Sequence, residues 1–196
     1  MQRHRAEFGM ILLAAASAVV GASLSGSAYP VETMLGEARA ACEVVFASQD
    51  VAGALTATGW KENQPKPGSW LAGELSDKWD SVGTPHRQFF KDVQGRPLFA
   101  IFGTDQDPKL SQTICIVRDP SAVLKGDSAR IEQWVERAPV APAIALPTLK
   151  GMDDVGFRKR WVPGLNPYSD ETQVNYAIGF GLTYFAVRIE EGIHPQ

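Results

Sequence analysis

The chain has two cysteines, Cys42 and Cys115, which lie 73 residues apart in segments of different periodicity. Around Cys42, apolar residues recur every three or four positions, the spacing of one helix face. Around Cys115, in SQTICIVRD, they occupy both faces of an extended run, which is typical of a central strand. A disulfide between them would join helix to sheet and reduce the entropy of the unfolded chain, a stabilisation of roughly 4 kcal/mol.

Other roles for the two thiols are a metal site, a catalytic pair with histidine, or burial as free thiols. Outside the C-terminal tail, the mature chain has a single histidine, His86, and it has no CxxC, HxxxH or HExxH spacing to gather ligands. The sequence therefore predicts a Cys42–Cys115 disulfide, with no metal and no cofactor. Two free buried thiols remain the main alternative.

The N-terminus has the order of a secretory signal peptide. Arg3 and Arg5 precede an uncharged run from Phe8 to Val20, and small residues follow as far as Ala28. The run is shorter than the about 20 residues that a membrane helix needs. We expect a Sec-type signal peptide cleaved after Ala28, which makes the protein periplasmic or secreted and leaves no stable membrane span. An uncleaved anchor is the alternative.

Residues 1–28 are therefore assigned to the signal peptide and residues 29–196 to a single domain. Within that domain, we expect residues 192–196 to form a flexible tail. The whole chain carries a net charge of −3. Such a mildly acidic chain argues against nucleic-acid binding, which favours a strongly basic face.

Periodicity predicts helices, then three strands, then a helix and three more strands. The helical segments are 31–47, 51–58, 70–79 and 128–138, and the extended ones are 86–93, 96–103, 111–119, 155–162, 172–180 and 182–190. The proline-rich segment 139–147 is either a connection or an edge strand. We expect an α+β fold, with an antiparallel sheet of about five to six strands and helices packed on one face. The order suggests a helix–three-strand pseudo-repeat.

Positive charge is most concentrated in RKRW, residues 158–161. On a strand, Arg158 and Arg160 share one face, while Lys159 and Trp161 share the other. Two arginines on one face can bind a phosphate or a carboxylate. We therefore predict an anion- or partner-binding site at Arg158, Arg160 and Trp161. A solvated strand face that discourages aggregation is the alternative.

Two tryptophans, Trp70 and Trp79, lie in the least regular predicted helix. Exposed aromatic side chains often anchor partner interfaces or sugar rings. Trp70 and Trp79 are therefore predicted partner-contact residues, with core packing as the alternative.

No catalytic residues can be assigned from the sequence, which has no GxSxG motif and no recognisable nucleophile. We expect a non-enzymatic binding module of a bacterial envelope, such as an inhibitor, an adaptor or an assembly factor. Its expected partner is a protein or an anionic glycan of that envelope. Two alternatives stay open. One is a small periplasmic hydrolase that uses His86 with nearby carboxylates, and the other is a structural envelope component.

Overall fold

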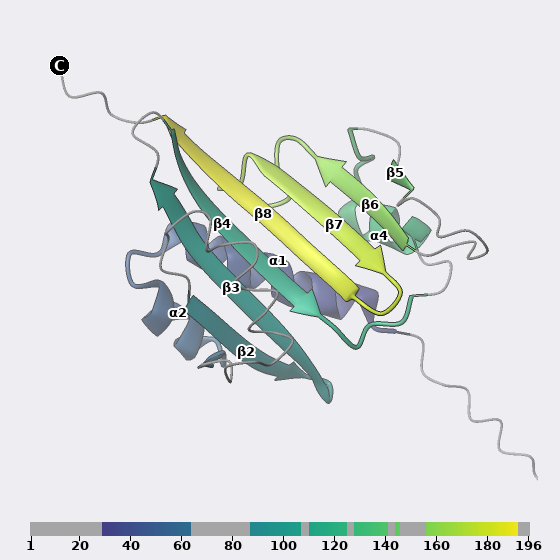
Figure 1. The fold of residues 1–196 in the computed structure, drawn as a ribbon, viewed down its shortest axis with the longest axis horizontal. Helices are drawn as coiled ribbons and strands as arrows, with labels where there is room; N and C mark the ends of the chain where they lie inside the picture. The colour runs from purple at the N-terminus through teal and green to yellow at the C-terminus, as the bar shows by residue number, and fades with distance from the viewer. Residues whose placement is uncertain are drawn as a thin grey trace, which may run out of the picture.

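The computed structural model describes residues 29–63, 87–106, 110–124, 128–140, 144–145 and 156–191. These residues form one antiparallel sheet, and the described helices cover one of its faces (Figure 1). The predicted α+β class and the one-sided helix layer are confirmed.

The sheet has eight strands within the described residues, so the expected count of five to six was too low. The strands are β1 Lys61–Glu62, β2 Arg87–Val93, β3 Arg96–Gln106, β4 Leu110–Asp119, β5 Ile144–Ala145, β6 Gly156–Trp161, β7 Glu171–Ala177 and β8 Gly181–Glu191. The count was low because β1 and β5 have two residues each, too few to show a periodicity. β5 pairs with β6, so the proline-rich segment contains an edge strand.

The strand order β1-β2-β3-β4-β8-β7-β6-β5 is symmetric about its central pair. Each half of the chain provides helical structure followed by a four-strand meander, and the last strands of the two meanders, β4 and β8, pair at the centre of the sheet. The two halves thus follow the expected pseudo-repeat, with four strands in each half where three were predicted.

The helices are α1 Val31–Ala47, α2 Val51–Ala57 and α4 Ser128–Val135. α1 lies across β3, β4 and β8 and contacts α2 and α4 (Figure 1). Its buried stripe consists of Val31, Met34, Leu35, Ala38, Ala41, Cys42, Val45 and Phe46. This three- and four-residue spacing presents one continuous apolar face to the sheet, so packing against the sheet stabilises the helix.

The turn residues of two hairpins adopt the conformations that tight turns require. Gln94 and Gly95 join β2 to β3 with φ values of 55° and 76°. Both lie in the left-handed region, as a two-residue hairpin turn demands. The β7–β8 turn has glycines with positive φ at Gly179 and Gly181. The sequence predicts extended segments on either side of both turns, 86–93 and 96–103 for the first and 172–180 and 182–190 for the second.

The chain is fixed to the folded body from Tyr29 onward. The Tyr29 hydroxyl donates a 2.8 Å hydrogen bond to the buried carboxylate of Asp119. Arg130 Nη1 donates to the Tyr29 carbonyl, and the Arg96 guanidinium lies 5.0 Å from the centre of the Tyr29 ring. The predicted cut after Ala28 would therefore leave this anchored residue intact. Within the described residues, no helix is both long and apolar enough to cross a membrane.

Candidate functional site

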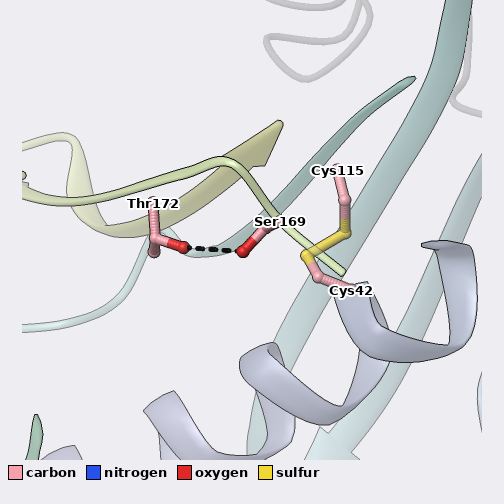
Figure 2. The surroundings of a disulfide bond; sticks show 4 residues. All are labelled: Cys42, Cys115, Ser169 and Thr172. Atoms are coloured by element: carbon pink, nitrogen blue, oxygen red, sulfur yellow. Dashed lines mark hydrogen bonds between the residues drawn. A yellow bond between two sulfur atoms is a disulfide. The ribbon is translucent and has the colours of Figure 1, made fainter. Parts of the chain in front are cut away.

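Cys42 of α1 and Cys115 of β4 form a disulfide, as predicted. Their Cα atoms lie 5.5 Å apart, and both residues are fully buried. Figure 2 shows the bond joining helix to strand, and in its surroundings Ser169, from the connection between β6 and β7, and Thr172, from β7. The disulfide therefore fixes α1 against the centre of the sheet, close to the chain that connects β6 and β7.

Arg158 and Arg160 both lie exposed on β6, on the sheet face opposite α1, which we call the distal face. Arg160 Nη2 donates to Glu171 Oε2 at 2.5 Å, and Gln173 donates to the other oxygen of the same carboxylate. The hydrogen bond from Arg160 holds the pKa of Glu171 below its usual range. Arg158 pairs with no carboxylate among the described residues, so its charge faces solvent.

Trp161 does not belong to the same surface. Its side chain is fully buried on the helix-covered face, and its indole N–H donates to the Arg137 carbonyl at 2.9 Å. Lys159 is also buried on that face and pairs with Glu132 of α4. The alternation of the strand therefore separates the predicted trio, and only the two arginines can meet a partner together.

The strand register extends the arginine surface across the distal face. Gln173 and Phe185 follow Arg160 in one row across β7 and β8, and the row continues to Ile116 on β4. Phe185 and Ile116 are partly exposed. Paired residues of an antiparallel sheet have side chains on the same face. The distal face therefore changes from charged at β6, through polar at β7, to apolar at β8 and β4.

Several predicted positions lie outside the described residues. These include Trp70 and Trp79, His86, and the proposed tail at residues 192–196. The hydrolase alternative that rests on His86 stays a prediction, as does the role of the two tryptophans.

A cavity of about 200 Å³ lies between α1, α4 and the segment after β6. Among the described residues, its lining consists of Arg39, Trp134, Val135, Arg137, Gly164 and Leu165. Arg137 Nη2 donates to the carbonyls of Pro163 and Gly164, at 2.5 and 3.2 Å. These bonds hold the Arg137 guanidinium at the cavity wall.

A buried polar cluster lies behind the Leu165 wall of this cavity. The Leu165 amide donates to Thr172 Oγ1 at 2.9 Å, and Thr172 pairs with Ser169 (Figure 2). Asn166 and Thr172 approach the phenol oxygen of Tyr184, but no regular hydrogen bond satisfies that oxygen or Asn166 Nδ2. Burial raises the pKa of Tyr184, so its hydroxyl stays protonated.

No family model, no curated protein and no solved structure matches this chain. The assignment of a site therefore rests on the geometry of the chain itself.

Sequence reasoning missed the cavity because its residues come from three distant segments. Trp134 and Arg137 lie in the helix predicted at 128–138, whereas Arg39 lies in the helix predicted at 31–47. The one available signal was the three-residue spacing of Trp134 and Arg137, which places both on one helix face. Nothing in the sequence indicated that Gly164 would meet them.

Proposed function

We propose that this chain is an exported, disulfide-stabilised binding module that recognises an acidic partner through the exposed face of β6. The observation that carries the proposal is the pair Arg158 and Arg160, which project from one exposed strand face. Residues two apart on a strand lie about 7 Å from each other. An extended segment with acidic side chains at alternate positions has the same repeat and can pair with both arginines.

The rest of the distal face favours a protein segment over a glycan as the partner. Beyond the arginines, the partly exposed Phe185 and Ile116 form apolar surface. Protein interfaces commonly combine an apolar centre with a charged rim. An anionic glycan could contact the arginines but would leave this apolar surface uncovered.

Export is supported by three features. The N-terminal 28 residues have signal-peptide order, the two cysteines are paired in a disulfide, and the residue after the predicted cut is anchored in the fold. Together they favour an oxidising compartment outside the cytoplasm.

The test measures binding of the oxidised chain 29–196 to poly-L-glutamate and to polygalacturonate at low salt. We expect the double variant Arg158→Glu/Arg160→Glu to lose binding to poly-L-glutamate. Wild-type binding should weaken as salt is added, because exposed charges are screened over about 10 Å at 0.1 M. Circular dichroism and thermal unfolding would confirm that the variant remains folded.

The matched control is Arg87→Glu. Arg87 is likewise an exposed arginine that pairs with a glutamate, Glu62, at 2.7 Å. It lies on β2, five strand positions from β6 and therefore about 24 Å away. The proposal is contradicted if Arg87→Glu weakens binding as much as the β6 variant, or if the wild-type chain binds neither polymer.

A further inference from the structure

We propose that the cavity between α1, α4 and the β6–β7 connection is a second, independent site, which binds a small organic acid with an oxyanionic head and a compact apolar body. The site lies on the helix-covered side of the sheet, whereas Arg158 and Arg160 lie on the distal face. A binding test of this cavity can therefore fail or succeed independently of a binding test of the arginine pair on β6.

The charged residues that line the cavity indicate that one end of the ligand is an anion. Most described cations pair with a carboxylate, as Arg87, Lys91, Arg130, Lys159, Arg160 and Arg188 do. Arg39 and Arg137 both line the cavity, and neither has a carboxylate partner among the described residues. Two guanidinium groups at one cavity offer the planar donor geometry that carboxylates and phosphates accept.

The other lining residues and the cavity volume indicate that the rest of the ligand is apolar and small. Trp134, Val135 and Leu165 contribute apolar side chains to the lining. A cavity of about 150 Å³ lined by apolar residues can hold benzene. The volume here, about 200 Å³, therefore suits one ring or a short branched chain together with a carboxylate. It is smaller than the roughly 300 Å³ at which drug-sized sites begin.

The polar cluster behind Leu165 fixes one wall of the site. Leu165 lines the cavity, and its amide donates to Thr172 Oγ1 at 2.9 Å. Asn166 and Tyr184 are buried beyond this wall and do not belong to the lining. The position of Leu165 is therefore set by the fold before any ligand binds.

The test uses benzoate as the probe and the oxidised chain 29–196 as the protein, with Trp134 fluorescence as the readout. We expect saturable quenching that disappears in Trp134→Phe, which keeps an aromatic wall. Arg39→Gln and Arg137→Gln should each weaken binding about 10- to 100-fold, the usual effect of losing a charge-assisted hydrogen bond. Arg39 is exposed and makes no hydrogen bond to the described fold, so its replacement should leave folding intact.

Three controls separate the alternatives. Benzamide, a neutral analogue of the same shape, should not bind at the concentrations that saturate benzoate. Arg87→Gln and the double β6 variant should both bind benzoate as the wild type does. The proposal is overturned if benzoate does not saturate at millimolar concentration or if both cavity arginine variants bind it unchanged. It is equally overturned if inorganic phosphate binds as tightly, since that result would leave the apolar walls without a role.

Discussion

Glu171 determines how much of the positive charge on β6 a partner can reach. Its carboxylate accepts from Arg160 at 2.5 Å and from Gln173 at 2.7 Å, while Arg158 has no carboxylate partner among the residues that the structure describes. An acidic partner must therefore compete with Glu171 for Arg160. No described carboxylate competes for Arg158.

Replacement of Glu171 by Gln should strengthen binding to poly-L-glutamate. The Glu171 carboxylate repels an acidic partner, and removal of this negative charge is worth about 1 kcal/mol of binding free energy in water, or roughly fivefold in affinity. The same titration used for the arginine variants measures this change. An affinity that falls in Glu171→Gln would mean that the partner does not approach Arg160.

The same substitution should affect stability in a pH-dependent way. The folded-state pKa of Glu171 lies below its ordinary value of 4.5, so the ion pair contributes its stability above that value. The contribution is lost as the pH falls through the lowered pKa. We expect Glu171→Gln to lower the free energy of unfolding by about 0.5 kcal/mol at pH 7, the usual contribution of an exposed ion pair. In strong acid, the variant and the wild type should have the same free energy of unfolding. Urea unfolding at both pH values tests this, and a pH-independent difference would contradict it.

Tyr29→Phe should destabilise the fold, because it removes a buried hydrogen bond to Asp119. The Asp119 carboxylate keeps its bonds from Ser121 but loses one donor at a buried position. We expect a loss of about 1–3 kcal/mol in the free energy of unfolding. Tyr168→Phe is the control, since Tyr168 is 44 % exposed, and it should change stability by less than about 0.5 kcal/mol. Equal effects of the two variants would show that the Tyr29 anchor contributes nothing.

Among the elements, the β7–β8 hairpin depends on two glycines for different reasons. Both Gly179 and Gly181 have positive φ, at 81° and 78°. A Cβ on Gly179 would meet nothing within 4 Å, whereas a Cβ on Gly181 would lie 2.0 Å from the Asp119 carbonyl oxygen. Gly181 therefore allows the end of β4 to approach the start of β8.

Gly181→Ala should consequently cost more stability than Gly179→Ala. The strain of positive φ alone costs about 1 kcal/mol, and a backbone clash adds to it. We expect about 1 kcal/mol for Gly179→Ala and at least about 2 kcal/mol for Gly181→Ala. Guanidinium unfolding of the two variants gives the comparison. Equal losses would mean that β4 and β8 can shift apart without cost.

The elements that the sequence predicted are those with enough residues to show a pattern. α1 has a full apolar stripe, and the turns at Gln94–Gly95 and Gly179–Gly181 carry residues that tolerate positive φ. β1 and β5 are too short for any periodicity. The alternation on β6 was correctly predicted, and it is the reason that Trp161 is separated from the arginines.

At the scale of the whole molecule, the disulfide and the β4–β8 pair hold the two halves together. Cys115 lies on β4, opposite Ala186 of β8, so the bridge from α1 reaches the strand at which the halves meet. The bridge itself could be predicted from two cysteines in a chain whose N-terminus has signal-peptide order. The β4–β8 pairing could not, because it joins strands distant in sequence whose contacts depend on the assembled fold. The cavity depends on the same assembly.

Removal of the bridge should destabilise the whole domain. The closed loop spans 73 residues, for which the chain-entropy estimate is about 4 kcal/mol. We expect the variant Cys42→Ala/Cys115→Ala to show a loss of that order in guanidinium unfolding. A loss below about 1 kcal/mol would mean that packing alone fixes α1 on the sheet.

The central claim is that this domain is exported and oxidised. It is tested most directly by the intact mass of the protein from the envelope fraction of its host, alkylated with and without prior reduction. We predict a chain that begins at Tyr29 and gains two alkyl groups only after reduction. A chain that retains residues 1–28 and takes up two alkyl groups without reduction would contradict the claim.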